Sequence, residues 1–230
     1  MFLELAEVLD CPDCEASAGL VAFVDRAQSR RVVEGRLGCP LCEIEVPIRR
    51  GTMRFDLSDA VRRATPRAET ARPAEHAHRA GTAPEAALRL AALLGVSDRA
   101  GMVVLLGPRL AAHAPAIARL GDRLEVLAWL PDPGDASPPA ALAVEDLVAG
   151  VDPLLGAAPE RWPIRSSALH GIALATPGPP QLSESARCTR PGARLVVETP
   201  TPADLDALAA SEFAEVASDD TVWVGERRPA

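Results

Sequence analysis

Apolar residues beyond position 84 recur in two alternating patterns. Short apolar runs, typical of buried parallel strands, occur at 102–106, 124–130, 171–175 and 194–198. Apolar residues at helical spacing predict helices over 85–94, 110–120, 140–148, 181–188 and 203–210. This alternation predicts an α/β fold, a doubly wound, mostly parallel sheet with helices on both faces. The runs 212–217 and 221–225 predict an antiparallel C-terminal hairpin.

The first 58 residues follow a different pattern. Apolar residues at helical spacing over 2–9 predict a short helix. Residues 20–24 and 31–37 are typical of two paired strands, and alternation over 44–48 predicts a half-buried strand. A turn at Arg50-Gly51 follows. We therefore expect a small α+β module that is separate from the α/β domain.

Composition excludes several classes of function. All 24 basic residues are arginines, which rules out a catalytic lysine. A net charge of −8 argues against sequence-independent binding to a phosphate backbone, so we do not expect nucleic acid as a partner. No apolar run reaches the roughly 20 residues that span a bilayer. Acidic residues near Met1, where a signal peptide would be basic, lead us to expect a soluble, cytoplasmic protein.

Four of the five cysteines form two matched Cys-x-x-Cys motifs, Cys11-Pro12-Asp13-Cys14 and Cys39-Pro40-Leu41-Cys42. Two such motifs offer four thiolates to a tetrahedral ion, which is how structural Zn²⁺ is held. Disulfides and thiol redox motifs are the alternatives. A cytoplasmic chain keeps its thiols reduced, and a redox motif needs only one pair, so we favour zinc. Four protein ligands leave no position for substrate, which makes the ion structural.

The chain therefore divides into three predicted parts. Residues 1–58 form a zinc-ribbon-like domain, 59–83 an Ala/Arg/Pro-rich linker, and 84–230 a Rossmann-like domain. His76 and His78 lie in the linker and could bind metal, but no third ligand is nearby. We interpret them as solvated residues.

Three stretches of the first domain carry a resemblance. They are Cys-Pro-Asp-Cys at 11–14, Gly-Arg-Leu-Gly-Cys-Pro-Leu-Cys at 35–42, and Glu-Val-Pro-Ile-Arg-Arg-Gly at 45–51. Together they resemble the small zinc domain of the activator subunit that supports tRNA, ribosomal-RNA and release-factor methyltransferases. Where Val46 stands, that family usually has an aromatic residue. The resemblance implies that this domain lends a strand edge and an apolar patch to a methyltransferase partner.

The expected patch consists of apolar residues from the predicted strands, namely Val21, Phe23, Ile44, Val46 and Ile48. Its partner would be another protein, either an active methyltransferase or a second copy of this chain. Alternatively, the second domain of the same chain covers the patch. The fusion would then replace a two-chain complex and raise the effective concentration through the tether.

The second domain resembles class I S-adenosylmethionine-dependent methyltransferases. Residues 162–172 are similar to that family's Leu-Pro-Phe…Ser-Phe-Asp-x-Val stretch before the fourth strand. Residues 184–197 are similar to Glu-x-x-Arg-x-Leu-Lys-Pro-Gly-Gly-x-Leu before the fifth. The terminal hairpin fits as well, so the resemblance spans about 145 residues, the size of one domain.

The cofactor-contacting positions depart from that family. Its first strand ends in an acid and Gly-x-Gly-x-Gly, whereas this chain has Leu105 for the acid, keeps only Gly107, and places Arg109 where a side chain would crowd the ligand. At the end of the second strand, the family has an acid that binds the ribose hydroxyls, whereas this chain has the apolar run Ala128-Trp129-Leu130. Each ribose hydroxyl left unpaired would cost on the order of 1–3 kcal/mol. The adenine-binding acid aligns with Ala157, and the Asp of Phe-Asp with His170.

Other residues have ordinary interpretations beside sharper ones. Asp132, Asp135 or Asp152 could substitute for the missing acids through an alignment slip. His170 could act as a base, but a strand-end histidine bonded to backbone is the simpler interpretation. Cys188 has arginine neighbours that could lower its pKa, yet we expect a buried residue.

Two further features concern the second domain. Ser166-Ser167 lacks the Gly-x-Ser-x-Gly frame of a nucleophile elbow. The proline-rich stretches 131–139 and 177–180 are hypothesised to cross the former cofactor edge as rigid loops that fill it.

These observations predict a zinc-binding protein whose methyltransferase-like domain is a pseudoenzyme. We expect no catalytic residues, no tight S-adenosylmethionine binding, and a role as scaffold or activator of a protein partner through protein–protein interaction. The alternative is an active S-adenosylmethionine-dependent methyltransferase with an atypical cofactor pocket. An open crevice beyond Leu106-Gly107 would favour that alternative, and one plugged by Arg109 and Trp129 would favour the scaffold.

Overall fold

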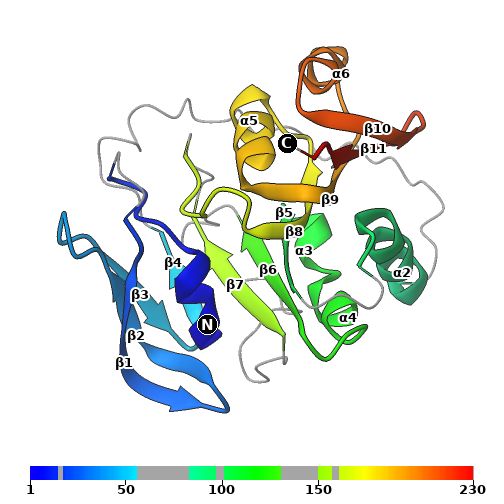
Figure 1. Ribbon diagram of the computed structural model, residues 1–230. Coiled ribbons are helices and arrows are strands. Elements are labelled where there is room, and N and C mark those ends of the chain that lie inside the picture. The colour runs from blue at the N-terminus through cyan, green and yellow to red at the C-terminus, as the bar shows by residue number, and fades with distance from the viewer. Residues whose placement is uncertain (15–17, 56–82, 97–100, 131–149, 157–160, 230) are drawn as a thin grey trace, which may run out of the picture.

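One continuous eleven-stranded sheet runs through the computed structural model (Figure 1). The structure describes residues 1–14, 18–55, 83–96, 101–130, 150–156 and 161–229. Several predicted features lie outside these residues: the linker up to residue 82 with His76 and His78, Asp132, Asp135, Ala157, the helix over 140–148 and the prolines of 131–139.

Seven strands build the α/β part of the sheet: β5 (Gly101–Leu106), β6 (Leu124–Leu130), β7 (Val151–Leu155), β8 (Leu169–Ala175), β9 (Thr189–Glu198), β10 (Phe213–Ser218) and β11 (Val222–Arg227). They follow the order β7-β6-β5-β8-β9-β11-β10. Strands β5 to β9 pair in parallel, and β11 pairs antiparallel with β9 and β10. The order reverses between β5 and β8, which is the switch point of a doubly wound sheet. The predicted parallel centre and C-terminal hairpin are confirmed.

Helices cover both faces of this part (Figure 1). One face packs against α2 (Ala83–Leu94), α3 (Pro108–Ala111) and α4 (Ala114–Ala118). The other packs against α5 (Pro179–Cys188) and α6 (Pro202–Ala209). Where one helix was expected over 110–120, the chain forms two short helices, and Pro115 lies in the first turn of the second, where its missing N–H is tolerated.

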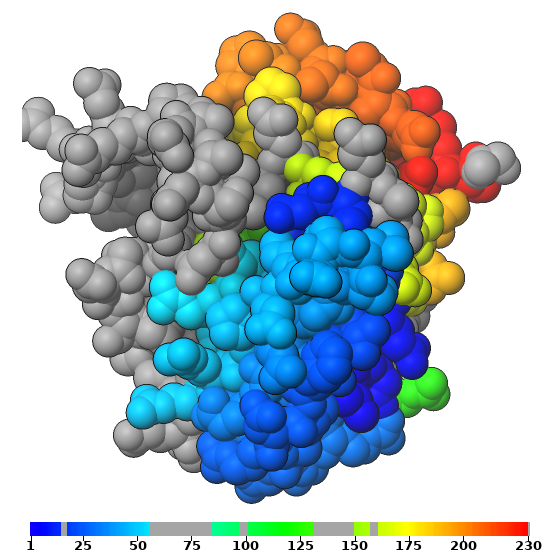
Figure 2. Space-filling view, turned by 90° about the vertical axis from the view of Figure 1, so that its left-hand side faces the viewer, coloured from blue at the N-terminus to red at the C-terminus, as the bar shows by residue number. Residues whose placement is uncertain are grey.

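The N-terminal part adds a short 3₁₀-helix and four antiparallel strands: η1 (Leu3–Val8), β1 (Val21–Gln28), β2 (Arg31–Gly38), β3 (Glu45–Arg49) and β4 (Thr52–Arg54). Strand β4 pairs in parallel with β7, with Met53 opposite Leu154. The N-terminal part therefore extends the α/β sheet within the same chain. Its strands, blue and cyan in Figure 2, form one face of the molecule.

One of the two apolar clusters of the described residues crosses the junction of the two parts. Leu9, Ile48 and Phe55 from the N-terminal part belong to the same buried cluster as Trp129 and Leu154. Among the helices in the described residues, none has the length and apolar character needed to cross a bilayer.

Candidate metal centre and cofactor edge

The structure brings the four motif cysteines together. Cys11 and Cys14 follow η1, and Cys39 and Cys42 lie in the connection between β2 and β3. All four sulfurs lie within 4.8 Å of one another, and none is in a disulfide. The Cys11–Cys42 and Cys14–Cys39 sulfur pairs are each 3.5 Å apart. Zn–S bonds of about 2.3 Å in a tetrahedron require sulfurs roughly 3.8 Å apart, so the cluster could hold zinc.

Local hydrogen bonds favour a thiolate in this cluster. Desolvation opposes ionisation of Cys39, but the backbone N–H groups of Leu41 and Cys42 outweigh it and lower the pKa of Cys39 to about 7. Burial raises the pKa of Cys11 to about 11, and hydrogen bonds from Cys42 and Cys39 raise the pKa of Cys14. A bound cation would lower these raised thiol pKa values, since thiols that coordinate a metal are deprotonated.

The expected apolar patch is split by the fold. Val46 and Ile48 are buried, at 2% and 1% exposure, and Ile44 is half-buried. Val21 and Phe23 remain 47% and 45% exposed on β1, an outer edge of the sheet. Most of the patch is therefore used within the chain, and only its β1 part faces solvent.

A buried ion pair fixes the two parts to each other. The Arg31 guanidinium on β2 donates to the Asp152 carboxylate and to the Val151 carbonyl on β7. Asp152 also accepts from the backbone N–H of Phe2 at 2.8 Å. Its side chain is 2% exposed. Asp152 is thus committed to this junction, near the amino end of β7, and does not replace a cofactor-binding acid at the carboxyl edge.

Two further charges complete this junction. The Met1 amino group donates to the Val32 and Gly51 carbonyls and lies 3.7 Å from Asp152, and its burial lowers its pKa to about 6. Glu125 on β6 lies 3.8 Å from Arg31. Burial, together with the neighbouring Asp152 charge, raises the pKa of Glu125 to about 7.

At the carboxyl edge of the sheet, the loop after β5 departs from a nucleotide-binding loop. Gly107 has φ 111°, which favours glycine, and Pro108 begins the four-residue helix α3 without a backbone N–H. Leu105 is fully buried in the core beneath the α2–α4 face. No acid stands at these positions to receive a ligand hydroxyl.

Arg109 reaches across the end of the neighbouring strand. Its Nε and Nη2 donate to Glu198 Oε2 at 3.2 and 2.7 Å, while 72% of its side chain is exposed. Glu198 ends β9, so the ion pair crosses the carboxyl end of β8, which lies between β5 and β9. The position of Arg109 at this edge was predicted from the sequence, whereas the role of Glu198 was not.

Trp129 does not plug the crevice as expected. Its side chain is 1% exposed, donates to the Gly156 carbonyl at 2.9 Å, and makes an edge-to-face contact with Trp162, with ring centroids 5.3 Å apart. The side chain is a core residue because alternation along β6 turns it to the sheet face opposite Ala128.

The structure gives the remaining candidates ordinary roles. The backbone N–H of Met102 donates to Nδ1 of His170, which also contacts Arg190, so His170 is a strand-end histidine bonded to backbone. Cys188 is fully buried, and desolvation raises its pKa to about 12. Pro179 begins helix α5 instead of continuing a covering loop.

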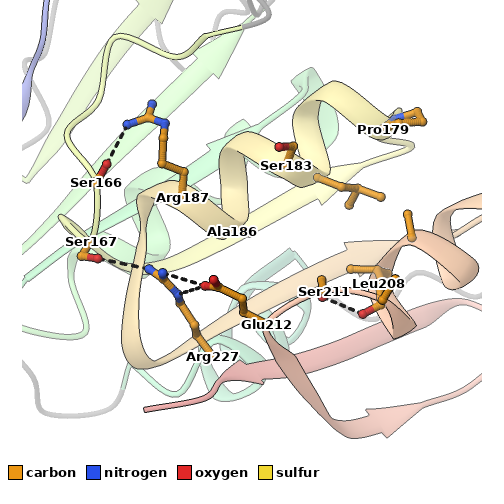
Figure 3. A pocket seen from close by; sticks show the side chains of 13 residues that line it. Ser166, Ser167, Pro179, Ser183, Ala186, Arg187, Leu208, Ser211, Glu212 and Arg227 are labelled. Atoms are coloured by element: carbon orange, nitrogen blue, oxygen red, sulfur yellow. Dashed lines mark hydrogen bonds and ion pairs between the residues drawn. The ribbon is translucent and has the colours of Figure 1, made fainter. Parts of the chain in front are cut away.

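A cavity of about 540 Å³ lies between α5 and α6 (Figure 3). Ser166, Ser167 and Arg187 form part of its wall, and Arg227 bridges Ser167 and Glu212 at 3.1 and 2.7 Å. Because Arg227 is neutralised by Glu212, and Arg187 by Glu184, the cavity presents no unpaired arginine charge. No pattern in the sequence predicted this cavity.

Comparisons with known proteins complete the picture. No family model matches the sequence, and no curated protein matches it. Similar solved structures include an O-methyltransferase from Thermotoga maritima (14% identity, TM-score 0.48, covering 64% of this chain and 66% of the other). A methyltransferase from Geobacter sulfurreducens has 15% identity and a TM-score of 0.43, with 66% of this chain and 91% of the other covered. The tRNA (m1A58) methyltransferase TrmI from Aquifex aeolicus has 12% identity and a TM-score of 0.43, with 64% of this chain and 70% of the other covered.

These structural neighbours are methyltransferases: the Thermotoga protein depends on S-adenosylmethionine, and the Aquifex protein is a tRNA methyltransferase. All three TM-scores are below 0.5, so the fold class follows from the strand order of the sheet. The matched region spans 66% of the Thermotoga chain.

Proposed function

We propose that this chain is a zinc-stabilised scaffold whose methyltransferase-like domain does not bind S-adenosylmethionine tightly and is not catalytic. The observation that carries this proposal is the Arg109–Glu198 ion pair across the end of β8. In addition, Leu105 on β5 stands where the resembling family has an acid. A bound cofactor would have to displace the Arg109–Glu198 pair. Its ribose hydroxyls would also lack the acidic acceptors that the resembling family provides.

The Cys11, Cys14, Cys39 and Cys42 cluster is proposed as a structural zinc site of the zinc-ribbon kind. Four thiolates fill the tetrahedron, so zinc supplies folding free energy here and no chemistry. The N-terminal module is proposed to act in cis, since the β4–β7 pairing resembles the strand-edge contact expected of an activator module. We propose a cytoplasmic location, where the thiols stay reduced.

Calorimetry with S-adenosylhomocysteine tests the non-catalytic assignment. The full-length, zinc-loaded chain is expected to give no binding heat at millimolar ligand. Micromolar affinity would contradict the proposal. Arg109→Ala is the matched variant: if the ion pair alone closes the site, the variant binds where the parent chain does not.

A second candidate is an active methyltransferase with an atypical pocket. It is favoured by Gly107, which is retained from the glycine-rich stretch of the resembling family, and by the switch point between β5 and β8. Methyl transfer from labelled S-adenosylmethionine to cell extract, abolished by Gly107→Val, would support this candidate over the scaffold.

The β1 edge is proposed as the partner-binding surface. Val21, Phe23 and Val24 are 45–47% exposed there, and an edge strand offers unpaired backbone groups to another strand. The partner is a methyltransferase or a second copy of this chain. Sedimentation at rising concentration tests the second copy: Phe23→Asp should abolish a dimer, and a parent chain that stays monomeric would exclude that partner.

A further inference from the structure

Residues 8–11, directly before and including the first cysteine ligand, form a strand-like bridge between two segments. On one side the Cys11 N–H donates to the Ala18 carbonyl at 2.7 Å. On the other side the Asp10 N–H donates to the Pro163 carbonyl at 3.2 Å, and the Arg165 N–H donates to the Val8 carbonyl at 2.9 Å. The metal motif is therefore hydrogen-bonded to the segment before β8.

Side chains reinforce this contact. Asp10 is 2% exposed and accepts from Arg165 Nε at 3.0 Å. The Arg165 guanidinium lies against Gly19, where an added Cβ would be 2.3 Å from Nη2. Gly19 in turn forms a β-bridge with Asp10. Arg165 therefore contacts both residues of the bridge that flanks Cys11 and Cys14.

The same segment is attached to helix α5 at its other side. The Trp162 N–H donates to Glu184 at 2.6 Å, and Arg187 donates to the Ile164 carbonyl at 2.8 Å and to the Trp162 carbonyl at 3.1 Å. The Ser167 N–H donates to the Arg187 carbonyl at 2.9 Å. Two neighbours in this network, Ser166 and Arg187, lie together in the wall of the α5–α6 cavity (Figure 3).

We propose that zinc at the four cysteines sets the position of residues 162–167 and, through them, the α5 wall of the cavity. The inference rests on the zinc site of the proposed function. Zinc ties Cys11 and Cys14 to the second motif, which holds residues 8–11 straight against 163–165. Without the ion, the two backbone hydrogen bonds and the Asp10–Arg165 pair lose their fixed support. Zinc binding in the N-terminal part would therefore change the conformation of residues 162–167 in the methyltransferase-like domain.

Hydrogen exchange of the full chain tests this link, with zinc content measured first. After chelation, the amides of Asp10, Arg165 and Ser167 are expected to exchange at least about tenfold faster, because local opening exposes them. Amides of helix α2, Ala83–Leu94, which packs on the opposite face of the sheet, should not change. Faster exchange confined to residues 8–20 would overturn the inference while leaving the zinc site intact. A chain that contains no zinc after incubation with the metal would refute the zinc site, and this inference with it.

A variant separates the link from general unfolding. Asp10→Asn removes the charge that holds Arg165 and keeps all four cysteines, so zinc content should stay the same. With zinc bound, exchange at 162–167 is expected to rise severalfold. Asp25→Asn, an exposed acid on β1, is the control and should change nothing. If chelation unfolds the whole chain, the zinc-bound Asp10→Asn variant provides the test. Unchanged exchange at 162–167 in this variant would contradict the proposal.

Discussion

Arg31 and Asp152 show how much a single pair of side chains determines at the junction of the two parts. Their side chains are 7% and 2% exposed, and they are 121 positions apart in sequence. Removing one partner of a buried ion pair leaves an uncompensated buried charge, which costs far more than losing a surface pair. The sequence holds no local signal of this pair, because its members belong to different parts of the chain. The cysteines, in contrast, could be predicted, since Cys-x-x-Cys spacing itself encodes the geometry of the cluster.

Arg31→Met and Asp152→Asn are each expected to lower the free energy of unfolding by about 3–5 kcal/mol. Urea unfolding measures the change. Arg26→Met is the matched control, since Arg26 forms a pair with Glu34 that is 63% and 37% exposed, and it should cost under about 1 kcal/mol. Equal costs for the buried and exposed arginines would contradict the junction described above.

Glu125 should make stability depend on pH. Its raised pKa of about 7 means that the folded state holds the proton more tightly than the unfolded state, whose pKa is 4.5. Stability from this group is therefore lost as pH rises from 4.5 to 7. Glu125→Gln should be more stable than the parent at pH 8, and the difference should vanish near pH 4. A difference that does not change with pH, in urea unfolding at several pH values, would show that Glu125 titrates normally.

At the scale of elements, the periodicity of the sequence predicted every described strand of the α/β part except β7. Strand β7 escaped because Asp152 and Pro153 interrupt its apolar run, and its pairing comes from the distant strands β4 and β6. One helix was expected over 110–120 because apolar residues keep helical spacing across the break. That spacing does not show that Pro115 lies in the first turn of a second helix. Strand-edge docking was anticipated, but its pairing with β7 could not be, since no local pattern encodes it.

Strands β1 and β3 should respond differently to truncation. Ile48→Ala on β3 removes a side chain that is 1% exposed and should cost about 2–4 kcal/mol in urea unfolding. Val21→Ala on β1 removes one that is 47% exposed and should cost under about 0.5 kcal/mol. The opposite order would mean that β1, and not β3, is covered in the folded chain.

For the whole molecule, the shared core predicts one cooperative unfolding transition. Leu9, Phe55 and Trp129 lie in one buried cluster that crosses the two parts, and β4 and β7 share backbone hydrogen bonds. Tryptophan fluorescence, which reports Trp129, Trp162 and Trp223, should therefore coincide with far-ultraviolet circular dichroism in urea. Two separated transitions in the zinc-loaded chain would show that the parts fold independently.

The central claim is that the carboxyl edge of the sheet no longer accepts an adenosyl ligand. A crystal of the zinc-loaded chain soaked in S-adenosylhomocysteine tests it directly. We expect no ligand density beyond Gly107 and an intact Arg109–Glu198 pair. A fully occupied nucleoside between β5 and β8, with Arg109 turned away from Glu198, would contradict it.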